Sequence, residues 1–223
     1  MSSTVQQDDL LTKKDSTKAA IVCTLRMPAH ASTTTQSFVE YHTKIGFSHI
    51  FLFFDVNTPS PAYKMVCEKK SSNVTAFLRD EALKSKLKKL SIWKDWGEYY
   101  EEEVQARQSL NATLALKLCR ERGLKWLLHI DSDELFHVSN SDTIHAHFDQ
   151  LERDNVMALT YTNHEGVRVL MSLSLSLGSL VIIAQFISSS SCQTGTRKFQ
   201  YRHTRTTRLL PNNYSVSKAL LES

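Results

Sequence analysis

Glycine and proline are scarce in this sequence. Its 223 residues include six glycines and four prolines, where average usage would give roughly 27 of the two together. This scarcity excludes a collagen-like chain and a flexible linker. Hydrophobic residues make up 41% and charged residues 22%, so a chain that is disordered over most of its length is also excluded. The length fits one large domain or two small ones.

Cysteine is sparse as well, and no C-x-x-C pair occurs. This absence excludes a zinc ribbon and a thioredoxin motif. Widely spread cysteines in a chain of this length indicate reduced thiols in a core. The four are Cys23, Cys67, Cys119 and Cys192.

Acidic residues almost disappear after residue 165. Residues 1–165 carry 20 basic and 22 acidic side chains, a net charge of −2, whereas residues 166–223 carry seven basic and one acidic, a net charge of +6. Such an asymmetry can mark a polyanion-binding tail. The basic stretch has little aromatic interleaving for base stacking, so we expect no specific nucleic-acid partner.

No apolar run occurs near the N-terminus. Residues 1–18 are polar and charged, so we expect a disordered lead-in without a signal peptide, and a cytosolic chain as written. Residues 169–187 form an apolar segment near membrane-spanning length. Its four serines and the Leu-Ser alternation of residues 173–177 favour strands. Membrane contact through this segment is therefore the less favoured interpretation.

Apolar runs alternate with helical patterns between residues 19 and 161. Ala19–Leu25 and His49–Phe54 are continuous apolar runs typical of strands covered on both faces. The helical pattern between them ends at Gly46, where a C-cap is expected. The sequence therefore predicts an α/β fold with a mostly parallel, Rossmann-like sheet. The remaining expected elements are helices over residues 63–70, 104–122 and 141–151, and strands over residues 73–77, 126–130 and 156–161; residues 79–103 have no clear assignment.

Two aspartates, Asp131 and Asp133, directly follow the apolar run of residues 126–130. In open α/β sheets, ligands bind beyond the carboxyl ends of the strands. Two neighbouring carboxylates repel each other, and a divalent cation between them removes that cost and can hold a diphosphate. This chemistry suits the departure of a nucleoside diphosphate. The alternative, a solvated loop or a helix cap, stays open because D-x-D is a common tripeptide.

Three blocks resemble the GT-A-fold glycosyltransferases, in the group near families 2 and 92. These blocks are W-L-L-H-I-D-S-D-E-L-F at residues 126–136, F-V-E-Y-H at residues 38–42 after Leu25-Arg26, and G-F-S-H-I-F-L-F-F-D at residues 46–55. The resemblance covers residues 19–165, which it implies to be a nucleotide-sugar-binding domain. Residues 166–223, apolar and then basic, form an atypical tail, and a fold incomplete at the C-terminus is one interpretation.

The resemblance implies transfer of a sugar from a UDP- or GDP-sugar donor to a hydroxyl of a glycan, protein or lipid acceptor. It places Mn²⁺ or Mg²⁺ at Asp131 and Asp133, with Asp131 also contacting the donor. Asp55 matches a position that contacts the base or ribose, and Leu25 and Arg26 line the same pocket. Members of the family commonly work in the secretory pathway, in the ER or Golgi.

Two further positions follow from the resemblance. Glu134 matches the fourth position of the motif and is expected to orient the loop or a metal-bound water. The catalytic base of an inverting enzyme is a carboxylate, which in the family lies after the D-x-D. The nearby acid is Glu165, and its alternative, an exposed loop acid before a glycine, is favoured.

Two other interpretations remain open. The chain is a degenerate or truncated glycosyltransferase-like protein if residues 166–223 derive from an altered reading frame or a retained intervening sequence. A haloacid-dehalogenase-type phosphohydrolase also places D-x-D after a strand, but normally after the first strand and with a threonine two residues beyond the second aspartate. Here at least two strands precede the motif, and Leu135 occupies that place.

Overall fold

The computed structural model describes residues 17–26, 31–138, 143–165, 181–186 and 214–218. Its strands follow the order β3-β2-β1-β4-β7-β6-β8-β5. The first four are parallel to one another, and their order is that of one half of a Rossmann-type sheet. The predicted α/β class and parallel sheet are therefore confirmed. These strands are β1 (Ala19–Leu25), β2 (His49–Phe54), β3 (Val74–Leu78) and β4 (Trp126–His129).

The other half of the sheet mixes strand directions. Strand β7 (Val181–Phe186) runs antiparallel to both β4 and β6 (Ala158–Glu165). Strand β8 (Tyr214–Lys218) is parallel to β6 and antiparallel to β5 (Glu134–Val138). Two strands of the predicted tail thus belong to the sheet.

The segment of residues 169–187 is described only where it forms β7. That part is a strand, as the Leu-Ser pattern beside it favoured, while residues 169–180 and 187 lie outside the described residues. None of the helices in the described part of the chain is long and apolar enough to span a bilayer.

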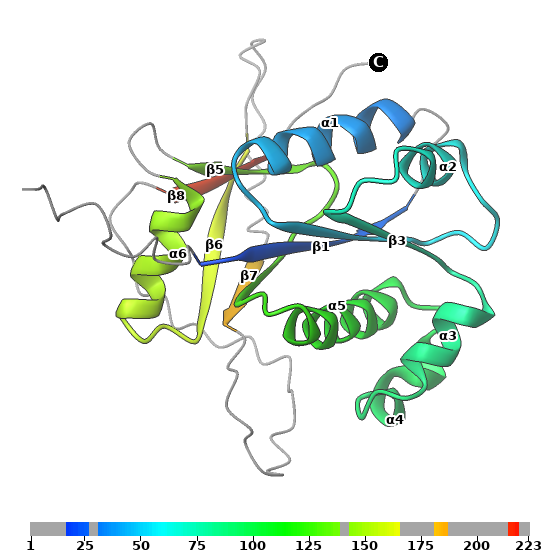
Figure 1. Cartoon of the computed structure of the whole chain (residues 1–223). Coiled ribbons are helices and arrows are strands. Elements are labelled where there is room, and N and C mark those ends of the chain that lie inside the picture. The colour runs from blue at the N-terminus through cyan, green and yellow to red at the C-terminus, as the bar shows by residue number, and fades with distance from the viewer. Residues whose placement is uncertain (1–16, 27–30, 139–142, 166–180, 187–213, 219–223) are drawn as a thin grey trace, which may run out of the picture.

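Helices cover both faces of the parallel half (Figure 1). One face packs against α1 (Ala31–Lys44), α2 (Pro61–Glu68) and α6 (Ile144–Arg153). The other face packs against α3 (Glu81–Leu87) and α5 (Val104–Glu121). Between α3 and α5 lie the short helix α4 (Trp93–Trp96) and a 3₁₀ turn, η1 (Gly97–Tyr99).

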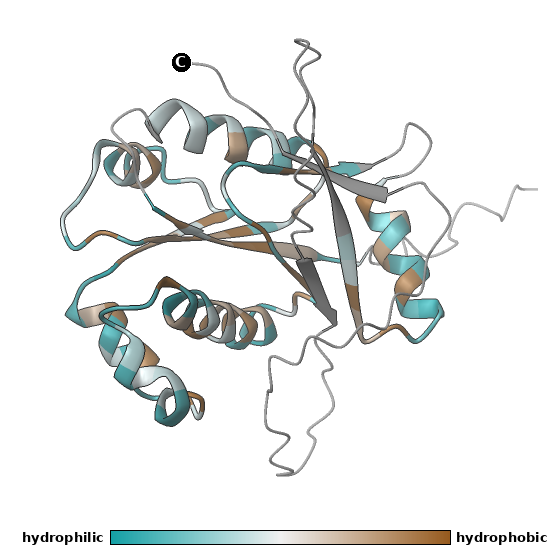
Figure 2. Ribbon diagram, turned by 180° about the vertical axis from the view of Figure 1, so that it is seen from behind, coloured by the Kyte–Doolittle hydropathy of each residue, from teal (hydrophilic) through white to brown (hydrophobic). Residues whose placement is uncertain are grey.

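The central strands are buried on both sides, as their continuous apolar runs predicted. Every residue of β1 is buried. Ile21 and Cys23 pack toward α1 and α6, whereas Ala20 and Val22 pack toward α5, because successive side chains of a strand point to opposite faces. In Figure 2 these strands are brown, while the helices alternate brown and teal along their length.

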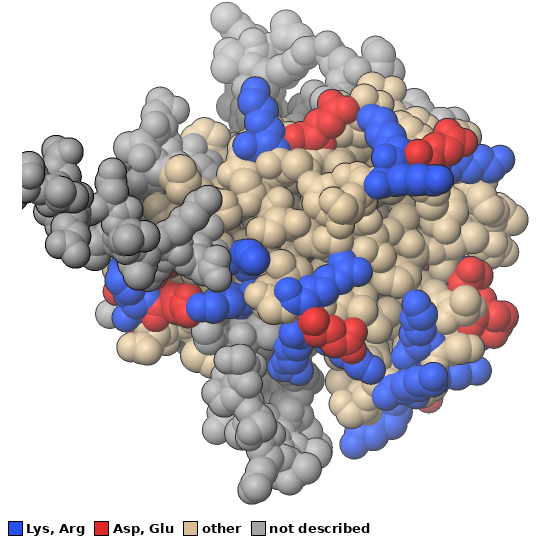
Figure 3. Space-filling view, viewed as in Figure 1, with Lys and Arg blue, Asp and Glu red and all other residues tan. Residues whose placement is uncertain are grey.

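Residues 79–103, which had no clear assignment, hold α3, α4 and η1. Only Leu83 and Leu87 of α3 are buried, so the helix has too few apolar positions to be recognised by its period. Exposed lysines lie at the end of α3 and directly after it: Lys86, Lys88 and Lys89. Lys and Arg gather over this part of the surface (Figure 3).

Two adjacent side chains of helix α1 form hydrogen bonds with the backbone of β5. The Tyr41 hydroxyl donates to the Phe136 carbonyl at 3.0 Å, and the Phe136 N–H donates to His42 Nε2 at 3.2 Å. His42 Nδ1 lies 2.8 Å from the Phe38 carbonyl, so this nitrogen carries the proton and Nε2 accepts. The E-Y-H block and the D-x-D-E-L-F block are therefore in direct contact.

Two sequence-based expectations need adjustment. Thr17, placed in the disordered lead-in, is 3% exposed and its hydroxyl donates to Glu152 of α6 at 3.0 Å. Cys23 and Cys119 are buried, free thiols as expected, but Cys67 is exposed on α2. Residues 1–16 and Cys192 lie outside the described residues.

Candidate functional site

The D-x-D-E segment forms a closed turn at the carboxyl end of β4. The Asp131 N–H donates to Glu134 Oε2 at 3.0 Å, and the Glu134 N–H donates to the Asp131 carbonyl at 3.2 Å. Glu134 is 1% exposed, whereas Asp133 is exposed at the tip and Asp131 is half-buried. Glu134 therefore closes the turn, and its implied role in orienting the loop or a metal-bound water stays a prediction.

Negative charge is concentrated where β1 and β4 end. Burial raises the pKa of the Cys23 thiol well above its usual value, and the charges of Asp131, Glu134 and Asp133 raise it further, in that order. Cys23 is the fifth of the seven residues of β1, so the field of all three carboxylates reaches the neighbouring strand. A cation at the turn is favoured by this field.

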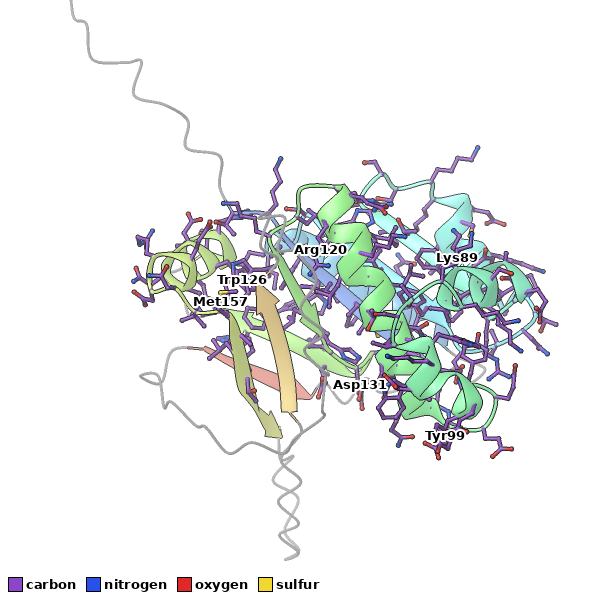
Figure 4. The ribbon with its side chains drawn as sticks, turned by 90° about the horizontal axis from the view of Figure 1, so that it is seen from below. Lys89, Tyr99, Arg120, Trp126, Asp131 and Met157 are labelled. Carbon is purple, nitrogen blue, oxygen red and sulfur yellow. The ribbon has the colours of Figure 1, made fainter. Side chains whose placement is uncertain are left out.

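Helix α5 reaches the carboxyl ends of three adjacent strands. Gln108 Nε2 donates to Asp131 Oδ1 at 3.3 Å. Arg107 binds Asp55, which follows β2, and Asn111 Nδ2 donates to Thr24 Oγ1 of β1 at 3.1 Å. Asp131 lies beside the N-terminal end of α5, far from Arg120 near the other end (Figure 4). None of these three α5 residues was singled out from the sequence.

Asp55 is held in a buried ion pair. Arg107 Nε donates to Oδ1 at 2.6 Å and Nη2 to Oδ2 at 2.9 Å, with side-chain exposures of 5% for Arg107 and 4% for Asp55. Arg79 Nη1 adds a third contact at 3.3 Å. The structure thus shows Asp55 joining α5 to the end of β2, and its predicted contact with a base or ribose stays a prediction.

Leu25 and Arg26 lie at the end of β1, next to Asp55. The Leu25 carbonyl accepts the Asp55 N–H at 2.9 Å, and the Leu25 side chain is fully buried in the core. Arg26 is exposed. The topology brings both to the edge that carries the D-x-D-E turn, and their lining of a donor pocket stays a prediction.

Glu165 is the last residue of β6. Its backbone is in register with Lys218 of β8, which is also in register with Glu134 of β5. Because neighbouring strands lie about 4.8 Å apart, the backbones of Glu165 and Glu134 are about 10 Å apart. Its backbone thus lies in a strand near the D-x-D-E turn, and its role as base stays a prediction.

The carboxylates of the turn can supply only some of the ligands of Mn²⁺ or Mg²⁺, so waters and phosphates would supply the others. No group of three His, Cys, Asp or Glu side chains in the described part of the chain is arranged to hold a metal. Mg²⁺, however, is usually held by one or two carboxylates together with waters and substrate phosphates. The exposed Asp133, the half-buried Asp131 and the field at Cys23 are consistent with such a site.

Comparisons with known proteins support the resemblance. No family model matches the chain. Two proteins of Arabidopsis thaliana, both described as glycosyltransferase-like, are 29% identical to it, over 153 and 126 residues. These matches cover 65% and 54% of this chain but 33% and 24% of the relatives. The chain is therefore similar to glycosyltransferase-like proteins and spans a third or less of their length.

Two solved structures show a distant likeness. Core-mannan synthase A from Aspergillus fumigatus, in its Mn/GDP form, is 13% identical, with a TM-score of 0.33 over 68% of this chain and 44% of that chain. The mannosyltransferase Ktr4p from S. cerevisiae is 10% identical, with a TM-score of 0.34 over 73% of this chain and 43% of that chain.

Proposed function

We propose that this chain carries the donor-binding part of a glycosyltransferase. It would move a sugar from a UDP- or GDP-sugar to an acceptor hydroxyl on a glycan, protein or lipid. The observation that supports this most is the D-x-D-E turn, closed by Glu134 at the carboxyl end of a parallel strand and contacted from α5. The similarity to glycosyltransferase-like proteins points the same way.

Asp131 and Asp133 are the proposed ligands of Mn²⁺ or Mg²⁺. When bound, the cation neutralises charge on the departing nucleoside diphosphate. Glu134 keeps the Asp131 backbone in place, and the Arg107–Asp55 pair joins α5 to the end of β2, on the other side of β1. Glu165 is the proposed base that accepts the proton of the acceptor hydroxyl, because it is the acid that follows the turn at this edge of the sheet.

Titration calorimetry with UDP and GDP, each with and without Mn²⁺, tests donor binding. The wild type should bind at least one of them in a Mn²⁺-dependent way. Asp131→Asn and Asp133→Asn should each weaken that binding roughly 100-fold, since each removes a unit charge close to the cation. Asp154→Asn, an exposed C-cap of α6, is the matched control. Binding that Mn²⁺ does not strengthen, or unchanged Mn²⁺-dependent binding in Asp133→Asn, would contradict the proposal.

Transfer is tested separately with Glu165→Gln. This variant should keep nucleotide binding and lose roughly 100-fold or more in sugar transfer or donor hydrolysis, the usual contribution of a general base. Binding without any transfer or hydrolysis by the wild type would instead favour a degenerate glycosyltransferase-like protein. Activity of Glu165→Gln equal to wild type would exclude Glu165 as the base.

A further inference from the structure

We propose that Gln108 is a positioning residue for Asp131. Its side-chain amide fixes the orientation of the carboxylate that would hold the cation, without adding a positive charge of its own. This inference rests on the proposed function, because it assigns a task to a residue beside the proposed metal ligand. It concerns a residue of α5 that lies 23 positions before Asp131 in the chain.

The contact adds to the support around Asp131. The backbone N–H and carbonyl of Asp131 are both bonded to Glu134, at 3.0 and 3.2 Å. Gln108 Nε2 adds a bond to the side chain itself, at Oδ1. A carboxylate on a turn keeps rotational freedom about its side-chain bonds unless a partner limits it. Gln108 supplies such a partner from a neighbouring helix.

Gln108 is held in place by the residues on either side of it. Arg107 is bound to Asp55 and also donates through Nη1 to the carbonyls of Tyr100 at 2.8 Å and Glu101 at 3.1 Å. Asn111, three residues further along α5, is 4% exposed and bonded to Thr24. The stretch of α5 that carries Gln108 is thereby tied to β2 and to β1, the strand that pairs with β4.

The chemistry of the partner matters as much as its position. At the ends of β2 and β4, which flank β1, α5 presents a guanidinium to Asp55 and a neutral amide to Asp131. A guanidinium or ammonium beside a metal ligand would compete with the cation for the carboxylate. A neutral donor orients the ligand and leaves its charge unchanged. Partners of metal ligands commonly act in this way, and their removal costs roughly 10- to 100-fold in metal affinity.

Two substitutions separate orientation from charge. Gln108→Leu removes the donor while keeping similar size and helix propensity. Gln108→Lys keeps a donor but adds a positive charge. Gln105→Leu is the matched control, since Gln105 lies on the exposed side of the same turn of α5. Each variant is titrated with Mn²⁺ at saturating UDP or GDP, and with the nucleotide alone in EDTA.

A positioning role makes three results expected together. Gln108→Leu weakens Mn²⁺ binding roughly tenfold, Gln108→Lys weakens it more, and neither changes nucleotide binding in EDTA. Gln105→Leu matches the wild type in both titrations. A merely structural role would instead lower the unfolding midpoint and affect both titrations alike.

If the wild type binds Mn²⁺ and Gln108→Leu binds it equally well, the inference is wrong while the proposed function stands. If the wild type shows no Mn²⁺-dependent binding, the proposed function itself fails, and the inference with it.

Discussion

Arg107 and Asp55 form an ion pair that is almost fully excluded from solvent. Burying two charges is costly, and their attraction offsets that cost only when the remaining hydrogen-bonding groups are satisfied. Here the Arg107 guanidinium donates to both Asp55 oxygens and to the carbonyls of Tyr100 and Glu101. The attraction and the hydrogen bonds therefore offset the cost of burying the pair. Removing one charge would leave the other buried without compensation.

Arg107→Met should destabilise the protein by about 3–5 kcal/mol, because among the described residues it leaves the buried Asp55 side chain with only the longer contact to Arg79. Asp55→Leu should cost a similar amount, and the double variant should cost clearly less than the sum of both. Urea denaturation of the four proteins gives this cycle. Removing the exposed Lys69–Glu40 pair, whose side chains are 51% and 61% exposed, should cost less than about 1 kcal/mol. Additive effects of the two buried changes would contradict the interpretation.

The site was predictable from sequence where its residues sit in a motif. Asp131, Asp133 and Glu134 follow an apolar strand, so strand and turn together indicated them. Gln108 and Arg107 were missed because polar side chains on a helix are normally assigned to its solvent face. Their partners lie 23 and 52 residues away, and such pairings are set by tertiary packing.

At the scale of secondary structure elements, the helices and strands with long apolar or periodic segments were the ones that the sequence predicted accurately. Strands β1 and β2 and helix α5 were predicted nearly to their ends, because continuous burial or a long period identifies them. Strand β5 was missed because its five residues directly continue the D-x-D turn and include Glu134 and His137. It is stabilised by pairing with β8 and by the bonds from α1, both distant in sequence.

Helix α1 ends at Lys44, and Gly46, two residues beyond it, has φ of +113°. An added Cβ would come within 3.2 Å of both His145 Nε2 and Ile144 Cγ1 of α6. Gly46→Ala should therefore cost about 2–3 kcal/mol, from backbone strain and from crowding. Gly123, with φ of +66° and no atom within 4 Å of an added Cβ, is the control, and Gly123→Ala should cost about 1 kcal/mol through backbone strain. Thermal or urea unfolding measures both, and an equal cost would show that α6 yields to the methyl group.

At the scale of the whole molecule, three histidines link stability to pH. Burial lowers the pKa of His42 and His129 to about 4 each, and burial together with the nearby Arg122 lowers the pKa of His49 to about 4. Free histidine titrates near pH 6.5. Between pH 6.5 and 4 the unfolded chain therefore binds more protons than the folded one, so the free energy of unfolding falls as the pH falls.

Urea unfolding at pH values from 8 to 4.5 should show this dependence. Stability should change little above pH 7 and then drop below pH 6.5, each histidine adding a slope of about 1.4 kcal/mol per pH unit. His42→Gln removes one titrating group and should reduce that slope by about 1.4 kcal/mol per pH unit, whatever its effect on stability at pH 8. Gln105→Leu, at an exposed position that does not titrate, should leave the slope unchanged. A flat profile between pH 6.5 and 5 would contradict the assignment of neutral, buried rings.

The central place of β1 has a consequence for synthesis on the ribosome. Strand β1 can pair with β2 once about residue 54 has emerged. Its other edge stays unpaired until β4 has been synthesised, where Ala19 pairs with Trp126. Helix α1 can form its hydrogen bond to β5 only after Phe136 has been synthesised. At roughly 5–20 residues per second, translation of the intervening stretch takes about 4–16 s. During that interval the nascent chain exposes an unpaired apolar strand edge, of the kind that recruits other strands. A chaperone that holds such edges would therefore act on this protein before its translation ends.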